Sequence, residues 1–412
     1  MPASVEIVGA AREDVAGPTP GVQRIEAIDV LRGVAVLMIF VVNIKSMAQP
    51  MSLYFAVDQW ASPIDQWVAR LQHLLVDEKF FTIFTALFGC GLALFCERAE
   101  AAQRSGGLIY RRLAVLLAIG VAHGALIWFG DVLALYAIAG FVALPFLKAS
   151  PRQLYAIAFA FLVARVAIEF SPLPGVVEHL VWGPAGAGGL EGGDGAAERA
   201  AYLGGVTQQF SARLSALTVA FTNGILVNLL RVVALMLAGI ALYRQGFFSG
   251  GWPMRAYLAV IAAAVACTVV LHGAAWGGAR LSGDNGLWAT LRLLSLFTQA
   301  FAYSAIVIAL VKHGVRLGAL AAVGRMALTN YIACSLIGTT IFYGHGLALY
   351  GSMGPAGLML VVAATWAVLL VLSPYWLARF RYGPLEWAWR SLTYGRAVPI
   401  RAKTSSAGMA AA

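Results

Sequence analysis

Long apolar segments recur along nearly the whole chain and constrain its fold more than any other feature. A transmembrane helix needs about 17–25 mainly apolar residues. Charged residues are 12% of the sequence and hydrophobic residues 60%, whereas about 25% of a soluble domain is charged. We therefore predict an all-α polytopic membrane bundle of about ten transmembrane helices. The ten segments are residues 29–47, 79–97, 111–129, 131–148, 152–170, 213–243, 254–273, 288–312, 326–344 and 356–378.

Basic residues occupy alternate connections between these segments. The other connections are acidic or nearly uncharged, and loops rich in Lys and Arg face the cytoplasm. We therefore expect both termini to be cytoplasmic. The formal charge of +10 is explained by this topology and does not indicate nucleic-acid binding. The basic connections contain Arg98, Arg104, Arg111 and Arg112; Lys148 and Arg152; Arg244 and Arg255; and Lys312, Arg316 and Arg325.

The polar ends of the sequence set the expected domain boundaries. Residues 1–25 lack the features of a signal peptide and are predicted to be a disordered cytoplasmic tail. Residues 26–396 are predicted to form the membrane bundle, and residues 397–412 a second disordered tail. The four cysteines lie in apolar segments without metal-ligand spacing, so we expect neither a disulfide nor a metal site.

His123 and Asp131 are the most informative polar residues within the apolar segments. Ionisable groups inside a membrane are costly and often functional. The turn at Phe129-Gly130-Asp131 is too short to carry the carboxylate far from the imidazole. A carboxylate can orient an imidazole and raise its basicity, so general-base chemistry is one interpretation. A structural hydrogen bond from the histidine to a neighbouring helix is the other.

Further polar residues have both a structural and a functional interpretation. Asp29 and Arg32 share a helical face at i,i+3 and can pair, or Arg32 can bind phosphate through its guanidinium group. Lys79 either extends to the interface or places positive charge beside the histidine. Arg231 is either a counter-charge for an anionic substrate or a tie between helices. Asn43 is a candidate hydrogen-bond donor.

Several motifs resemble those of a known family. They are IDVLRGVAVLMIFVVNI, EKFFTIFTALFGCGLAL, AHGALIWFGDVLALYAIAGF, GRMALTNYI and RYGPLEWAWRSLTYGR. Together they resemble the YeiB family, which carries the DUF418 domain, here at about residues 230–396. The DVLRG opening is also similar to heparan-α-glucosaminide N-acetyltransferase of lysosomes, and the wider group is regarded as transmembrane acyltransferases. In the lysosomal enzyme a histidine follows the first span, where this chain has Lys45 to Gln49.

The resemblance implies an acyltransferase of a bacterial-type plasma (inner) membrane that uses cytoplasmic acyl-CoA, most simply acetyl-CoA. The acceptor would be a hydroxyl or amine of a sugar, a lipid-linked molecule or a small metabolite. His123 would be catalytic with Asp131 as its partner, and Asn43, Lys79 and Arg231 would contact the substrate or the oxyanion. The expected CoA-binding residues are Asp29, Arg32, Arg111, Arg112, Arg325, Asn330, Tyr331 and Arg390.

Other functions and assemblies remain open at this level. A proton-coupled transporter or exporter would also place histidine, aspartate and arginine within the membrane. A non-catalytic scaffold is a further alternative. Glycines in the Phe88–Gly91 segment permit close helix contact, either within one chain or between the subunits of a homodimer. The sequence GPLEWAWR predicts a turn and a short amphipathic helix in which Glu386 pairs with Arg390 at i,i+4.

Overall fold

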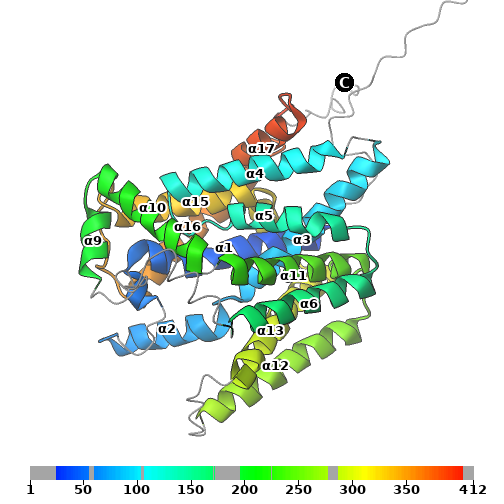
Figure 1. Cartoon of the computed structure of the whole chain (residues 1–412), viewed down its shortest axis with the longest axis horizontal. Helices are drawn as coiled ribbons and strands as arrows, with labels where there is room; N and C mark the ends of the chain where they lie inside the picture. The colour runs from blue at the N-terminus through cyan, green and yellow to red at the C-terminus, as the bar shows by residue number, and fades with distance from the viewer. Residues whose placement is uncertain are drawn as a thin grey trace, which may run out of the picture.

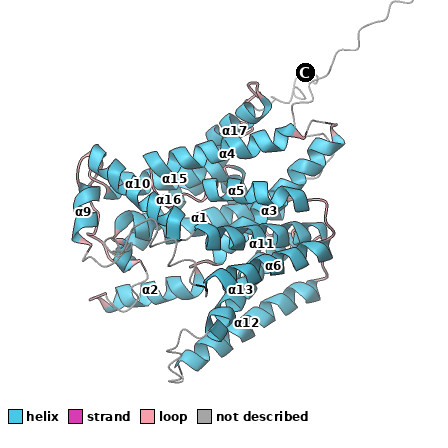
Figure 2. Cartoon of the chain, viewed as in Figure 1, coloured by secondary structure: helices cyan, strands magenta, loops and turns pink. Residues whose placement is uncertain are grey.

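The computed structural model describes residues 25–54, 60–103, 106–169, 171, 195–223, 225–276 and 286–401. Every secondary-structure element named within these ranges is an α-helix or a short 3-10 helix, as Figure 2 shows. The all-α prediction is therefore confirmed. They are α1 (Glu26–Ala48), η1 (Met51–Leu53), α2 (Pro63–Leu75), α3 (Lys79–Ala101), α4 (Gly107–Leu126), α5 (Leu133–Ala143), η2 (Leu144–Phe146), α6 (Pro151–Glu169), α9 (Ala196–Leu203), α10 (Val206–Asn223), α11 (Ile225–Arg244), α12 (Met254–Trp276), α13 (Gly286–Lys312), α14 (Gly318–Arg325), α15 (Ala327–Phe342), α16 (Pro355–Leu377) and α17 (Pro384–Tyr394).

Helix α1 lies in the middle of the bundle (Figure 1). It packs against α3, α13, α14, α15 and α16. Its sequence is apolar on nearly every side, and such a helix is stable only when it is surrounded by other apolar surfaces. Helix α11 packs in turn against α3, α5 and α6, while α17 lies across α4 and α15.

Glycines set the closest helix crossings. A Cβ atom on Gly324 of α14 would lie 1.8 Å from the backbone oxygen of Asp29 in α1, and one on Gly33 would lie 2.0 Å from the oxygen of Leu320. Gly89 of α3 meets the backbone of α11 in the same way. Small residues allow backbones to approach this closely. The glycines of the Phe88–Gly91 segment therefore include one that makes a contact within the chain.

The number of membrane spans differs from the expectation of ten. Seven described helices are long and apolar enough to cross a membrane, or eight if α14 and α15 form one broken span with a bend of 84°. The stretches Leu133–Phe146 and Met254–Val270 are apolar but shorter. The predicted segment 213–243 is two helices, α10 and α11. The sequence at that boundary is Asn-Gly, a common helix-breaking pair.

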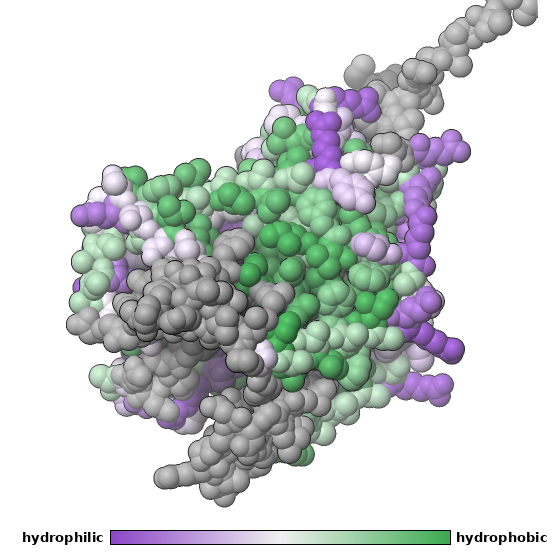
Figure 3. Space-filling model, viewed as in Figure 1, coloured by the Kyte–Doolittle hydropathy of each residue, from purple (hydrophilic) through white to green (hydrophobic). Residues whose placement is uncertain are grey.

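The molecular surface agrees with a multi-pass membrane protein. Hydrophobic residues cover the centre of the coloured part of the face in Figure 3, and hydrophilic residues line its right edge and lie at its top and left. The right edge, which we call the basic end, is the side at which α3 ends and α4 begins (Figure 1). Arg98 stands in the last turn of α3, and Arg111 and Arg112 in the first turns of α4. The opposite end, which we call the far end, carries α2 and α9 (Figure 1).

The ends of the chain are described only in part. The predicted tail at residues 1–25 lies outside the described residues except for residue 25, as do residues 402–412. Residues 397–401, which we expected in the second tail, fold back instead. The indole nitrogen of Trp387 donates to the oxygen of Val398 at 2.7 Å, and the N–H of Arg381 donates to the oxygen of Ile400 at 2.8 Å.

Candidate active site

His123 and Asp131 form a buried pair where α4 meets α5. Nδ1 of His123 lies 2.9 Å from Oδ1 of Asp131, and the two side chains are 1% and 3% exposed. Oδ2 of Asp131 accepts the backbone N–H of Ala134 at 2.7 Å, which satisfies one of the free N–H groups in the first turn of α5. Because both oxygens are held, the carboxylate fixes the imidazole ring and favours the tautomer with its proton on Nδ1.

A glycine in α4 makes room for this junction. A Cβ atom on Gly120 would lie 2.3 Å from the backbone nitrogen of Ala134 and 2.7 Å from Oδ2 of Asp131. No side chain at position 120 would therefore allow α4 and α5 to approach as they do. The predicted proximity of His123 to Asp131 is confirmed by this geometry, and their catalytic role remains a prediction.

The second nitrogen of the His123 imidazole, Nε2, is not engaged by Asp131. It is buried and has no hydrogen-bond partner within the described part of the chain. The ring of Tyr331 lies 5.2 Å away between centroids, and that of Trp128 lies 6.3 Å away and edge-on. A buried nitrogen without a partner costs about 1–3 kcal/mol, and a deprotonated Nε2 is the atom that a general base requires.

Tyr331, one of the expected CoA-binding residues, lies beside this pair. Along α1, Asp29 meets Gly324 near one end and Met47 meets Gly338 near the other. Tyr331 lies between these two glycines in the sequence, in the second turn of α15. Its hydroxyl is 3.4 Å from the backbone oxygen at position 130, under the turn that carries Asp131. The bend between α14 and α15 thus brings this tyrosine to the imidazole, which sequence spacing did not reveal.

None of the three residues expected to contact the substrate, Asn43, Lys79 and Arg231, forms a hydrogen bond with Nε2 of His123 within the described structure. Nζ of Lys79 donates to the backbone oxygen of His73 at 2.7 Å. The preceding residue, Glu78, has a φ of 68°, which turns the start of α3 back towards α2 and explains this contact. Arg231 forms an ion pair with Glu78 and is therefore a tie between α11 and the start of α3. Asn43 lies half-buried in the far half of α1.

Three of the expected CoA-binding arginines come together at the basic end. The guanidinium of Arg112 lies 3.8 Å from the ring centroid of Trp389 and 4.6 Å from that of Phe95. Arg32 and Arg390 are near enough for their charges to act on it. None of the three guanidinium groups forms an ion pair with a carboxylate among the described residues, including Asp29. Uncompensated like charges of this kind attract an anion such as phosphate.

The remaining CoA-binding candidates are dispersed. Arg111 is exposed and lies beside Gly395 at the end of α17. Asn330 is buried, and its Nδ2 donates to the hydroxyl of Ser373 at 3.1 Å and to a backbone oxygen of α14 at 3.0 Å. Its amide therefore ties helices together. Asp29 and Arg325 flank the crossing of α1 and α14.

Helix α17 is joined to α15 through one carboxylate. Glu386 accepts the N–H groups of Leu328 and Thr329 at 2.7 and 3.1 Å and the hydroxyl of Thr329 at 2.6 Å. These are free N–H groups in the first turn of α15. Burial raises the pKa of Glu386, and the hydrogen bonds to Leu328 and Thr329 oppose this. The expected pair with Arg390 is wrong, because that guanidinium lies 4.6 Å from the ring of Tyr382.

A second polar cluster, which the sequence analysis missed, lies at the far end. Nζ of Lys45 is 3.1 Å from both carboxylate oxygens of Asp77, and Nδ1 of His73 is 3.4 Å from one of them. The spacing of His73 and Asp77 at i,i+4 was the available signal. No group of three metal-ligating side chains occurs in the parts of the chain that the structure describes.

Two family models and several curated relatives are similar to this chain. The model for "Protein of unknown function (DUF418)" matches residues 242–396, and that for "Heparan-alpha-glucosaminide N-acetyltransferase, catalytic" matches residues 24–183. Uncharacterized protein YxaH of Bacillus subtilis is 31% identical over 94% of this chain and 98% of its own length. Uncharacterized protein YeiB of Escherichia coli is 29% identical over 93% of this chain and 100% of its own length. No solved structure matches. The chain therefore belongs to the YeiB/DUF418 family of membrane proteins, which is related to heparan-alpha-glucosaminide N-acetyltransferase.

Proposed function

We propose that this protein is an integral membrane acyltransferase. It moves an acyl group, most simply acetyl, from acyl-CoA at the basic end to a hydroxyl or amine of an acceptor. The observation that carries the proposal is the free, buried Nε2 of His123, held by Asp131 in the form that accepts a proton. The match to the acetyltransferase model covers both residues.

The chemistry requires one proton acceptor and an activated acyl group. Nε2 of His123 takes the proton from the acceptor hydroxyl or amine as its oxygen or nitrogen attacks the thioester carbonyl. The bond between the carbonyl carbon and sulfur then breaks, and the imidazolium returns its proton to the departing CoA thiolate. Asp131 stabilises the imidazolium while it exists.

The arginine cluster supports the choice of donor. The phosphates of CoA are anionic, and Arg32, Arg112 and Arg390 lack carboxylate partners among the described residues. Arg112 and His123 lie on one helix and eleven residues apart, which is about 16 Å along its axis. The pantetheine arm between the CoA phosphates and the thioester is of comparable length. Because acyl-CoA is made in the cytoplasm, the proposal places the basic end there, in a bacterial-type plasma membrane with both termini inside.

The test is binding of acetyl-CoA and unacylated CoA to the purified protein, measured by calorimetry and thermal shift. Arg32→Ala and Arg112→Ala should each weaken binding about tenfold, because a charge-assisted hydrogen bond contributes about 1.5–3 kcal/mol. Arg379→Ala is the matched control, since this arginine follows α16 and lies over the ring of Tyr375. Absence of stabilisation by either compound would oppose the proposal and favour a transporter.

A further inference from the structure

An exposed apolar strip on α16 leads to a tyrosine and then to an arginine. Val368, Val371, Leu372 and Tyr375 share one face of this candidate spanning helix, and each is 46% to 67% exposed. A spanning helix turns such a face towards the hydrocarbon chains of lipids, and tyrosine is common at the level where the headgroups begin. The guanidinium of Arg379 lies 3.9 Å from the ring centroid of Tyr375, and its Nη1 donates to the backbone oxygen of Tyr375 at 3.3 Å. The strip therefore ends in a cation at the depth of the headgroups.

The folded-back end of the chain places more arginine beside this point. An antiparallel backbone bridge joins Phe380 to Arg401, and the N–H of Arg381 donates to the oxygen of Ile400 at 2.8 Å. The indole of Trp376 stacks on Phe380 with 4.3 Å between the ring centroids, which fixes the other side of the turn. The backbones of Arg381 and Arg401 are thus held next to each other, and a ligand that binds both has little ordering left to do.

We call Arg379, Arg381 and Arg401 the basic turn. None of the three forms an ion pair with a carboxylate among the described residues. The carboxylate of the neighbouring α17, Glu386, is already engaged, because each of its oxygens accepts a hydrogen bond from the first turn of α15. Like charges held together without a counter-ion repel one another, so an anion that binds between them is stabilised.

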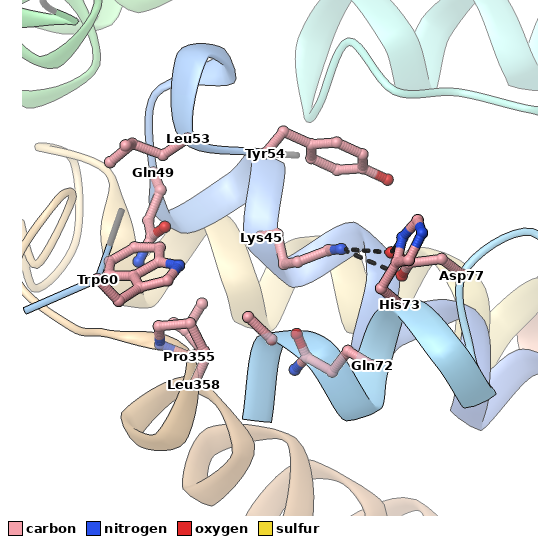
Figure 4. Close-up of a pocket in the computed structure, with 11 residues that line it drawn as sticks. Lys45, Gln49, Leu53, Tyr54, Trp60, Gln72, His73, Asp77, Pro355 and Leu358 are labelled. Atoms are coloured by element: carbon pink, nitrogen blue, oxygen red, sulfur yellow. Dashed lines mark hydrogen bonds and ion pairs between the residues drawn. The ribbon is translucent and has the colours of Figure 1, made fainter. Parts of the chain in front are cut away.

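A lysine at the far end shows the contrast. Figure 4 shows the ammonium of Lys45 beside the carboxylate of Asp77, with 3.1 Å to each oxygen, so these two charges cancel. The basic turn lies at the opposite end, since α17 follows it directly and packs against α4. Clusters of arginine and lysine immediately beyond a spanning helix attract lipids with anionic headgroups. The uncompensated charge at this place therefore points to a lipid partner.

We infer that the basic turn binds the headgroup of an anionic phospholipid whose acyl chains lie along the exposed strip of α16. The guanidinium groups donate to the phosphate oxygens. The apolar strip directly beside them is what distinguishes a membrane lipid from a free phosphate, because it gives the acyl chains a surface to cover. This site is separate from the arginine cluster assigned to CoA, and it does not depend on acyl transfer.

The experiment titrates phosphatidylglycerol and phosphatidylcholine, with the same acyl chains, into the full-length protein in dodecyl maltoside. Bound lipid is counted by native mass spectrometry. Phosphatidylglycerol should bind about tenfold or more tightly than phosphatidylcholine, because each arginine near an anionic headgroup contributes about fivefold. Arg379→Gln should weaken phosphatidylglycerol binding about fivefold, and the double variant Arg379→Gln, Arg401→Gln about 25-fold. Phosphatidylcholine binding should change less than about twofold.

The control removes the same charge elsewhere. Arg255 is exposed, stands in the first turn of α12 in another basic connection, and that helix packs against α13. Arg255→Gln should therefore change phosphatidylglycerol binding less than about twofold. The double variant Arg379→Lys, Arg401→Lys keeps both charges and should keep the preference for phosphatidylglycerol. Because Arg379 and Arg401 are exposed, the thermal midpoint without lipid should be unchanged in each variant, so that loss of binding is not loss of the fold.

Each contrary result would overturn the inference. Equal affinity for the two lipids, or undiminished phosphatidylglycerol binding in the double glutamine variant, would remove the basic turn as an anionic-lipid site. An equal loss in Arg255→Gln, or a loss of preference in the double lysine variant, would do the same. Displacement of phosphatidylglycerol by inorganic phosphate would assign the turn to a free anion. Loss of acetyl-CoA binding in the double glutamine variant would assign it to the CoA site instead.

Discussion

Replacing Asp131 by Asn tests the proposed chemistry directly, because it changes a charge and a tautomer with little change in shape. In the native pair, one carboxylate oxygen accepts from His123 at 2.9 Å and the other accepts from Ala134 at 2.7 Å. Asparagine has one acceptor oxygen. If it keeps the bond to Ala134, its NH2 group faces Nδ1 of His123 and donates to it, and the imidazole proton moves to Nε2.

The expected size of the effect follows from the bonds that change. Loss of a hydrogen bond to a charged group costs about 1.5–3 kcal/mol, and each 1.4 kcal/mol is about a factor of ten. The reversed tautomer adds to this loss, since Nε2 can then no longer accept a proton. The same substitution in a serine protease lowers turnover about 10⁴-fold. We therefore expect acyl transfer to fall by about 10²- to 10⁴-fold, with a small change in stability because the bond to Ala134 survives.

Two measurements check this expectation. Release of CoA from acetyl-CoA is followed in membrane vesicles that contain the variant, and ¹⁵N-histidine NMR reports the tautomer of His123. Asp65→Asn is the matched control, because Oδ1 of Asp65 accepts the N–H of Ala356 in the first turn of α16 at 2.8 Å, and this aspartate forms no ion pair with a histidine within the described structure. Full turnover with the proton moved to Nε2 would refute general-base catalysis by His123.

Two further predictions concern the helix joints. Glu386→Ala should destabilise the fold by about 2–3 kcal/mol through lost caps of α15. Because the pKa of Glu386 is raised in the folded protein, its protonation stabilises the fold. This contribution is complete below the ordinary glutamate pKa of about 4.3 and is lost as the pH rises through the folded pKa. Glu386→Gln should therefore flatten the pH dependence of the thermal midpoint between pH 4 and pH 8, and an unchanged slope would contradict this. Gly324→Ala should cost about 1–3 kcal/mol by overpacking against α1, whereas Gly318→Ala in the same helix meets no atom within 4 Å and should be neutral or stabilising; equal midpoints for both would refute the close crossing.

Local sequence signals predicted the features that depend on neighbouring residues. The apolar segments indicated helices within a membrane, because backbone groups there must be bonded internally. The pairing of His123 with Asp131 was predictable because the turn between them is too short to separate the two side chains.

Local spacing failed where a partner from another helix offered better bonding. Glu386 and Arg390 stand at i,i+4, yet Glu386 binds the N–H groups of α15, which are buried donors with no other partner in their own helix. Lys79 bonds to the end of α2 because the left-handed Glu78 reverses the chain there. For Glu386, bonding to these backbone groups outweighs a surface ion pair, which contributes about 0–1 kcal/mol.

The sequence by itself therefore determined the class of the protein, its helical segments and the pairing of His123 with Asp131, since each depends on composition or on a few consecutive residues. Only the tertiary structure decided that the charges of Arg32 and Arg390 act on Arg112, that the ring of Tyr331 lies beside the imidazole, and that Lys45, His73 and Asp77 meet at the far end. These groupings join residues tens or hundreds of positions apart. They depend on helix crossings that are set by glycines, and a single sequence does not reveal which glycine meets which helix.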